Sequence, residues 1–389
     1  AVTGISALAA SEPLDTWKEY LRFHALEHAS PYLAKAFVQE SFEFHQHVLA
    51  GTPQLRDRWK RAVDDTDAAL GDAVGKLYVE RYFPASEKAR AQAMVRNLVA
   101  AFATRIERLE WMAPETRRQA KAKLATLKVG LGYPDKWRDY SGLEVVRGDA
   151  LGNAGRAELF EYHSNLAKLA RPVDRAEWCM TPQTVNAVNL PAMNALNFPA
   201  AILQPPYFDP QRDPVLDYGA IGAVIGHEIS HSFDDQGALF DAEGRLRNWW
   251  TPDDFAHFEA AGKRLAEQFD GYRPFPDVAV NGRQTLSENI ADVAGLAVSL
   301  DAWRLTLGGK PPAGAAGFSA EQLFFLSFAQ SWRQSIREAA LRQRLVTDGH
   351  APAEYRADTV RNLDAWYAAF GARPGQKLYL APADRVGVW

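Results

Sequence analysis

Two histidines and one glutamate in the segment His227-Glu228-Ile229-Ser230-His231 have the spacing of a zinc site. Residues at positions i and i+4 lie one above the other on a helix face, so both imidazoles could bind one metal ion. Glu228 could then take a proton from a water whose pKa zinc lowers, acting as general base. The apolar residues 220–225 before the motif are typical of a buried helix. The alternative is a pair of structural histidines.

Catalytic zinc usually has three protein ligands, and residues 287–295 offer the third. Glu288 and Asp292 fall on one face of a predicted helix that is otherwise largely apolar, where an unpaired carboxylate pair is costly. We expect Glu288 to be the third ligand and Asp292, as part of the catalytic set, to accept a hydrogen bond from one ligand histidine. Asp234 could do the same for the other histidine. The alternative for Glu288 and Asp292 is a salt-bridged helix face.

A second histidine pair, in His24-Ala25-Leu26-Glu27-His28, has the inverted zinc motif. It also places two imidazoles on one helix face, but no convincing third ligand follows it. We therefore interpret His24 and His28 as structural or surface residues. A metal site that uses His24, Glu27 and His28 remains the rival to the first site.

The composition is that of an ordinary globular protein, with 47% hydrophobic and 24% charged residues in a chain of 389. The net charge of -4 gives no reason to expect nucleic acid as a partner. No apolar run has the length of a transmembrane segment. The single cysteine, Cys179, excludes a disulfide within the chain and is expected to be a small buried residue.

Apolar residues recur at helical spacing through most of the chain, which predicts a mainly α fold with a small β element. Ser86 is expected to cap one helix, and Pro114 to stand in the first turn of another. A change in character near residue 180 predicts a helical domain over 1–180 and a catalytic domain over 181–389. Helices are expected over 17–51, 55–82, 217–234, 286–307 and 320–341, a loop over 130–152, and a strand at 196–198.

Further motifs occur along essentially the whole chain: Val74-Gly75-Lys76-Leu77-Tyr78-Val79, Gly132-Tyr133-Pro134-Asp135, Asn186-Ala187, residues 198–208, the zinc motif through Asp235, residues 288–292, 328–332 and 348–352, and the ending Arg385-Val386-Gly387-Val388-Trp389. With these motifs in this order, the sequence resembles the neprilysin family of zinc endopeptidases. The resemblance implies a thermolysin-like (zincin) catalytic domain, one zinc ion per chain, and part of a helical lid domain.

The resemblance also implies roles for residues outside the zinc motifs. Asn186 and Ala187 would hold the substrate main chain, and His350 would stabilise the oxyanion. Arg356 would bind a substrate carbonyl or anchor the site. Without the resemblance, His350 would be interpreted as an ordinary loop histidine.

Four further residues match positions that line the pocket for the residue after the scissile bond: Ile202, Tyr207, Val224 and Trp332. The resemblance therefore implies an apolar pocket and a preference for bulky hydrophobic residues in oligopeptide substrates. Core packing is the alternative explanation for these four side chains.

The chain departs from the family pattern in two respects. Asn189 stands where the family has tyrosine, which implies an altered contact at the edge of the substrate site. Family members are also longer, so the chain is expected to begin inside the lid domain and to have the missing N-terminal segment as a partner.

The alternative function is a zinc-binding but inactive fragment that needs this segment. The composition suggests a bacterial protein, periplasmic or secreted.

Overall fold

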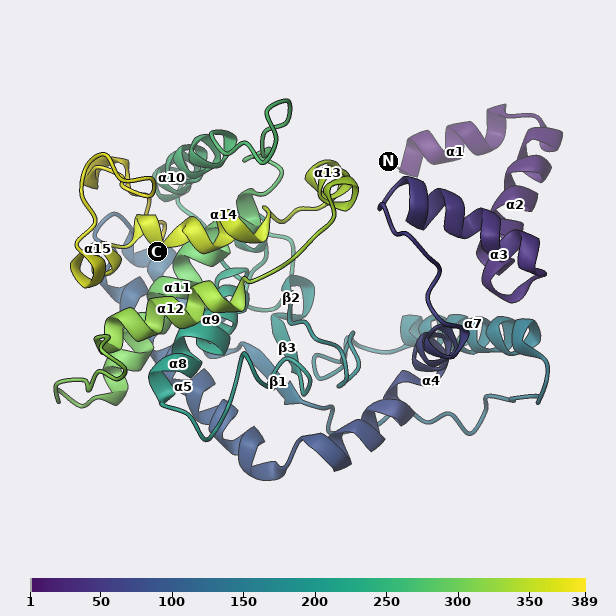
Figure 1. Ribbon diagram of the computed structural model, residues 1–389, viewed down its shortest axis with the longest axis horizontal. Helices are drawn as coiled ribbons and strands as arrows, with labels where there is room; N and C mark the ends of the chain where they lie inside the picture. The colour runs from purple at the N-terminus through teal and green to yellow at the C-terminus, as the bar shows by residue number, and fades with distance from the viewer. Residues whose placement is uncertain (1) are drawn as a thin grey trace. The chain divides into compact units, whose positions relative to one another are not determined.

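The computed structural model describes residues 2–389, which divide into two compact units (Figure 1). Unit 1 comprises residues 2–70, Asp139–Arg171 and Ile336–Arg344, and unit 2 comprises Gly71–Arg138, Pro172–Ser335 and Leu345–Trp389. This division does not follow a single boundary near residue 180, because residues 71–138 pack with unit 2. The division of the chain into domains 1–180 and 181–389 stays a prediction.

Unit 1 consists of helices that bury very little. Within its described residues, Ser30 is the only buried one. The single helix expected over 17–51 is wrong, because Ser30–Tyr32 forms a 3-10 turn with Pro31 and Leu33 is extended. Unit 1 holds α1 (Val2–Ser11), α2 (Leu14–Ala29), α3 (Lys35–Phe42), α7 (Ala150–Leu166), the first part of α4 (Arg58–Tyr82) and most of α13 (Glu338–Thr347).

Unit 2 contains a three-stranded sheet in the order β1-β3-β2. The central strand β3 (Ala195–Pro199) is entirely buried, which confirms the strand expected at 196–198. Strand β1 (Lys128–Gly132) pairs parallel with β3, and β2 (Val188–Leu190) pairs antiparallel with it, Val188 opposite Asn197. Strand β2 is therefore an edge strand, and it packs beside the helix that carries the zinc motif.

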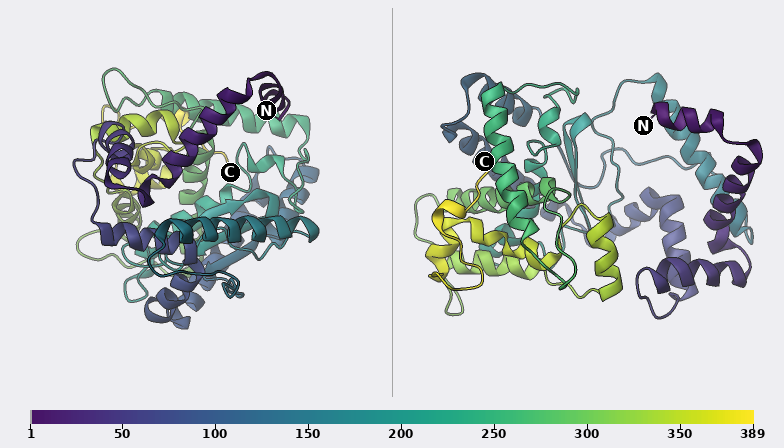
Figure 2. Two further views of the ribbon diagram at one scale, coloured as in Figure 1. Left: turned by 90° about the vertical axis from the view of Figure 1, so that its right-hand side faces the viewer. Right: turned by 90° about the horizontal axis from the view of Figure 1, so that it is seen from above.

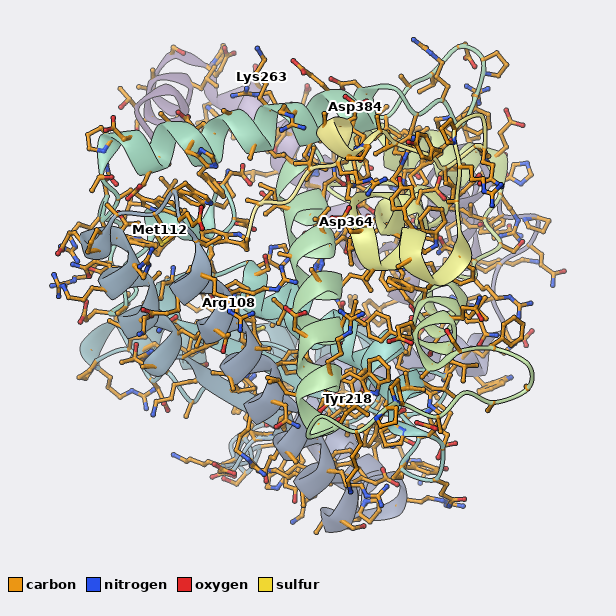
Figure 3. The ribbon with its side chains drawn as sticks, turned by 90° about the vertical axis from the view of Figure 1, so that its left-hand side faces the viewer. Arg108, Met112, Tyr218, Lys263, Asp364 and Asp384 are labelled. Atoms are coloured by element: carbon orange, nitrogen blue, oxygen red, sulfur yellow. The ribbon has the colours of Figure 1, made fainter. Side chains whose placement is uncertain are left out.

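Helix α11 (Leu286–Thr306) lies at the centre of unit 2 and packs against α5, α9 and α10. Figure 3 shows α5, which ends at Arg108, running along α11, and α10, which carries Lys263, crossing its end. The C-terminal residues, yellow in the figures, lie against the green helices of the same unit in every view (Figure 2). The other helices of unit 2 are α5 (Ala85–Arg108), α6 (Pro114–Ala125), α8 (Pro214–Asp217), α9 (Ala223–Ser230), α10 (Pro252–Asp270), α12 (Ala320–Ser331), α14 (Ala353–Ala357) and α15 (Asp364–Phe370).

Several local expectations are confirmed and others are wrong. Pro114 stands in the first turn of α6, as expected, and α11 matches the helix expected over 286–307. Ser86 does not cap α5, because the helix already begins at Ala85 after the extended Pro84. The helix expected over 320–341 ends at Ser331. Cys179 is exposed rather than buried.

The loop expected over 130–152 is wrong at both ends, because β1 occupies Lys128–Gly132 and α7 begins at Ala150. Two of the glycines that suggested a loop, Gly130 and Gly132, belong to the strand. A Cβ on Gly130 would lie 2.7 Å from side-chain atoms of Asn197 and Trp178, so close packing requires glycine there. Among residues 2–389, no helix has the length and apolar character that crossing a membrane requires.

Candidate active site

The helix with the zinc motif and the helix with Glu288 approach each other through two glycines. A Cβ on Gly226 would lie 2.5 Å from the Gly295 carbonyl oxygen, and a Cβ on Gly295 would lie 2.3 Å from the His227 nitrogen. Glycine at both positions therefore lets the backbones of α9 and α11 touch. This contact holds His227 opposite the first turns of α11, where Glu288 and Asp292 lie.

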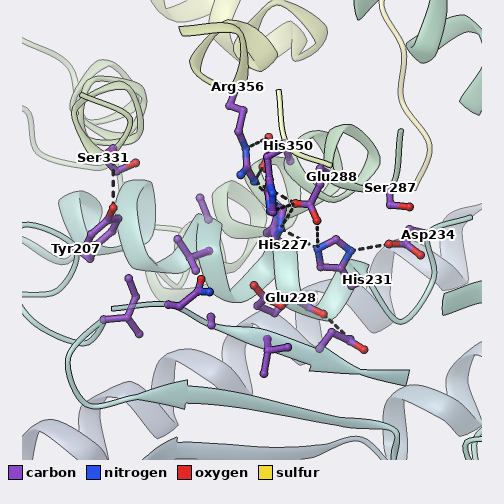
Figure 4. Close-up of a pocket in the computed structure, with 18 of the residues that line it drawn as sticks. Tyr207, His227, Glu228, His231, Asp234, Ser287, Glu288, Ser331, His350 and Arg356 are labelled. Carbon is purple, nitrogen blue, oxygen red and sulfur yellow. Dashed lines mark hydrogen bonds and ion pairs between the residues drawn. The ribbon is translucent and has the colours of Figure 1, made fainter. Parts of the chain in front are cut away.

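His227, His231 and Glu288 converge on one point, and their possible ligand atoms all lie within 4.8 Å of one another (Figure 4). The two Nε2 atoms are 2.9 Å apart. His227 Nε2 is 3.2 Å from Glu288 Oε2, and His231 Nε2 is 3.5 Å from Glu288 Oε1. In the described part of the chain, this is the only group of three or more such side chains with the spacing of a metal site.

The donor set fits a zinc ion. His227 Nδ1 donates to Asp292 (2.9 Å), and His231 Nδ1 donates to Asp234 (2.6 Å), which leaves the Nε2 lone pairs facing each other and Glu288. Glu288 Oε2 is buried and accepts no well-formed hydrogen bond from any described residue. Two imidazoles and one carboxylate are the protein ligands of many catalytic zinc sites, and carboxylates commonly hold the other ring nitrogen.

The electrostatics of the cluster favour positive charge at its centre. Burial works against the charged Glu288 carboxylate, but its interactions with His227, His231 and His350 hold its pKa far below the usual range. Burial likewise works against charged His231, yet Asp234 and Glu288 hold its pKa well above the usual value. A proton or a metal ion can supply the charge that the cluster attracts, so metal binding would release protons.

Asp292 is held between a histidine and an arginine. Arg356 donates to both of its carboxylate oxygens, from Nε at 2.7 Å and from Nη2 at 2.8 Å. Burial would raise the pKa of Asp292, but Arg356 lowers it below the usual value. The guanidinium of Arg356 also lies 4.2 Å from the centre of the Trp332 ring. Asp292 is therefore a charged acceptor that fixes the orientation of His227.

Glu228 lies in the wall of the same cavity, one residue after His227 (Figure 4). Burial raises the pKa of its carboxyl group, and His227 and His231 oppose that effect. Its main-chain carbonyl accepts a hydrogen bond from Asn189 Nδ2 at 2.7 Å, and the same amide lies 2.8 Å from Ser232 Oγ. Asn189 thus connects the edge strand β2 to helix α9.

His350 approaches the cluster from a loop. Its Nε2 is 3.0 Å from Glu288 Oε2, and its Nδ1 donates to Asp348 at 2.7 Å. The interaction with Glu288 raises the pKa of His350, although burial opposes it. The structure therefore brings this histidine, distant in sequence, to the side of the candidate metal site.

A cavity of about 540 Å³ is lined by every site residue expected from the sequence. Its polar wall holds the candidate ligands, Glu228, Asp234, Asp292, His350 and Arg356. The remaining walls include Asn186, Ala187, Ile202, Tyr207, Val224 and Trp332. These residues come from separate parts of unit 2, so the fold gathers them at one site.

The rival site at His24, Glu27 and His28 does not form a cluster of ligands. His24 and His45 both contact Glu27, at 3.2 and 2.8 Å, whereas His28 is paired with Glu158 at 2.5 Å. All of these side chains lie in unit 1 and are at least one-third exposed. The structure supports their interpretation as surface histidines.

The contacts of three polar residues near the site were not predicted from the sequence. Ser287 donates to Asp235 at 2.6 Å and so connects the start of α11 to the turn after α9. Asp348 holds His350, and Asn189 holds the main chain at Glu228. The position of Asp348 two residues before His350 is a signal that could have identified it, because an aspartate often orients a functional histidine.

The sequence is similar to that of known peptidases. Models of peptidase family M13 match residues 1–134 and 186–386. An endothelin-converting enzyme homolog of Locusta migratoria is 34% identical over 95% of this chain and 52% of its own length. A neutral endopeptidase of Lactobacillus helveticus is 34% identical over 96% of this chain and 56% of its own length. The chain thus spans about half the length of these relatives.

Two solved structures are similar to the whole fold. The inhibitor complex of the zinc metalloprotease ZMP1 of Mycobacterium tuberculosis has a TM-score of 0.96 and 46% identity, covering 99% of this chain and 59% of that protein. PEPO of Lactobacillus rhamnosis has a TM-score of 0.83 and 36% identity, covering 93% of this chain and 56% of that protein. With the family models matching most of its length, the chain belongs to peptidase family M13, the neprilysin family.

Proposed function

We propose that this chain is the catalytic part of a zinc endopeptidase that hydrolyses oligopeptides. The observation that carries the proposal is the convergence of His227, His231 and Glu288 in a cavity that also holds Glu228 and His350. These three ligands would hold one zinc ion. When bound, zinc polarises a scissile carbonyl and lowers the pKa of a water molecule.

Glu228 and His350 would handle the proton and the developing negative charge. Glu228 would accept a proton from the attacking water and pass it to the leaving amine, and a carboxyl pKa raised by burial suits this exchange near neutral pH. In its protonated form, His350 would donate from Nδ1 to Asp348, and its Nε2–H would then be available to donate to an oxyanion.

Substrate binding would use the edge strand and the apolar wall. Asn186 and Ala187 directly precede β2, and an edge strand can pair with an extended peptide through main-chain hydrogen bonds. The side chains of Ile202, Tyr207, Val224 and Trp332 would receive the residue after the scissile bond. Their apolar character favours a bulky hydrophobic residue at that position.

One observation favours the alternative that the isolated chain binds zinc but needs a further segment for turnover. Unit 1 leaves large apolar side chains exposed, among them Leu21, Phe23, Leu26 and Trp59, each more than half exposed. Surfaces of this kind usually contact other protein. We propose that an N-terminal segment of the same protein covers them, since the relatives are about twice as long.

We also propose a location for the protein. A periplasmic or secreted site is the expectation from composition, and the oligopeptide substrates proposed above suit such a compartment. Secretion of the protein by its source organism, detected by fractionation, would support it.

The test compares the chain with Glu228→Gln, using zinc content and cleavage of a quenched peptide with a central Phe or Leu. We expect one zinc ion in both proteins and a loss of about 10²–10⁴-fold in kcat for the variant. Glu267→Gln, at an exposed position on α10, is the matched control and should cleave normally. Zinc without cleavage by the unmodified chain would support the alternative, and a chain that binds no zinc would contradict both.

A further inference from the structure

Lys123 on helix α6 is a buried lysine near the candidate metal site. It is 1% exposed, although lysine is almost never fully buried unless its charge is satisfied. Its Nζ donates to the main-chain carbonyls of Gly237 and Phe240, each at 2.7 Å. Because Lys123 binds two carbonyls of the same turn, it helps to fix the conformation of that turn.

The turn in question follows the zinc motif and carries Asp234, the acceptor for His231. One oxygen of Asp234 accepts from His231 Nδ1 at 2.6 Å, and the other accepts from the Gly237 N–H at 2.6 Å. The main-chain oxygen of Asp234 accepts from the Ala238 N–H at 2.9 Å. The peptide between Gly237 and Ala238 is therefore bound on one side by Asp234 and on the other by Lys123.

The turn has little room to adjust. A Cβ on Gly237 would lie 1.8 Å from the His231 carbonyl oxygen, so the chain folds back directly onto the end of the zinc motif. The position of α6 is fixed as well, because Asn194 Nδ2 donates to the Lys123 carbonyl oxygen at 3.0 Å. A displacement of the Gly237 carbonyl would therefore be passed on to Asp234 and His231.

The charges around Lys123 also favour its position beside the turn. Burial lowers the pKa of Lys123 to about 7, while the carboxylates of Asp234 and Asp241 act in the opposite direction. Removal of the lysine would take one donor from each carbonyl, leaving Gly237 with the Phe240 N–H and Phe240 with the Trp249 indole N–H, each at 3.0 Å. The loss of these two buried hydrogen bonds costs free energy for as long as the turn keeps its shape.

We propose that Lys123 is a positioning residue for His231, acting through the turn of residues 234–240. The inference rests on the proposed zinc site. Helix α6 lies far from the zinc motif in sequence, and through Lys123 it would help to orient the ligand His231. Mutation of a side chain that orients a ligand histidine typically changes metal affinity about 10–100-fold. Lys123 contacts the turn that holds such a side chain, Asp234, and does not contact the histidine itself.

The first experiment measures the zinc dissociation constant of the full chain by chelator competition. We expect Lys123→Met to weaken zinc binding about 10-fold. Lys121→Met is the matched control, because Lys121 lies on the same helix, is half exposed and should not affect zinc. Zinc binding by Lys123→Met equal to that of the unmodified chain would overturn the inference.

A double-mutant cycle then separates positioning from general loss of structure. If Lys123 acts through Asp234, the effects of Lys123→Met and Asp234→Asn on zinc affinity are less than additive. The same lysine variant combined with Asp292→Asn, which affects the other histidine, should be additive. Additivity in both cycles would overturn the inference.

Should Lys123→Met fail to fold, Lys123→Gln enters the same cycles, because its amide can still donate one hydrogen bond. An unmodified chain without zinc affinity would refute the proposed function itself. Zinc binding that Asp234→Asn weakens and both Lys123 variants leave unchanged would refute the inference alone.

Discussion

Arg356 connects the candidate metal ligands to the substrate pocket. Its guanidinium donates to both oxygens of Asp292, which accepts from His227, and one nitrogen lies 3.5 Å from Glu288. The same group lies over the ring of Trp332 in the pocket wall. A residue with these contacts can keep a buried carboxylate charged and still border the space proposed for the substrate.

Loss of Arg356 should therefore destabilise the protein strongly. Arg356→Met leaves the buried Asp292 carboxylate without its cation, and breaking a buried pair costs about 3–5 kcal/mol. Arg118→Met is the control, because the pair of Arg118 with Glu115 is exposed and such pairs contribute at most about 1 kcal/mol. Denaturant unfolding of both variants measures the difference. Equal stabilities would show that Asp292 does not depend on Arg356.

At the residue scale, the sequence predicted the groups whose chemistry is tied to spacing. His227, His231, Glu288 and Asp292 follow helix periodicity, and the structure brings them together. Lys123 could not be predicted, because nothing in a helical segment distinguishes a buried lysine from an exposed one. Its role appears only when α6 and the turn after α9 are placed side by side.

At the scale of elements, the contact between α9 and α11 determines the distance between the histidines and Glu288. Gly226 and Gly295 meet at this contact, where either Cβ would overlap the neighbouring backbone. The sequence indicated both helices but not their closeness, because a glycine within a helix has several possible explanations. For the same reason Gly130 suggested a loop, although it belongs to β1.

The substitution Gly295→Ala should separate the two helices. Its Cβ would lie 2.3 Å from the His227 nitrogen, so the helices must shift, and overpacking of this kind costs about 1–3 kcal/mol. Zinc affinity should fall with stability, because His227 moves relative to Glu288. Gly262→Ala on α10 is the control, since the nearest atom to its Cβ would be at an ordinary 3.6 Å. Unfolding and zinc titration check both variants, and an unaffected Gly295→Ala would contradict the close contact.

For the whole molecule, the two units differ in how much they bury. Unit 2 contains a continuous core that includes Leu98, Phe198, Ile225 and Leu296, all fully buried. Within the described part of unit 1, only Ser30 is buried. Helical periodicity predicted helix over 17–51 and 55–82, although the first of these is broken at Ser30–Tyr32. It could not show that their apolar faces remain uncovered, because periodicity does not identify what a helix packs against.

This difference predicts unequal stability within one chain. Helices with few buried apolar contacts open with free energies near zero, whereas core helices open only with global unfolding. Hydrogen exchange of the chain should therefore show rapid exchange in α2 and α7 and slow exchange in α9 and α11. Added zinc should slow exchange further in α9 and α11, which carry the proposed ligands, and leave α2 and α7 unchanged. Protection of α2 and α7 equal to that of α11 would show that unit 1 is stable without a further segment to cover it.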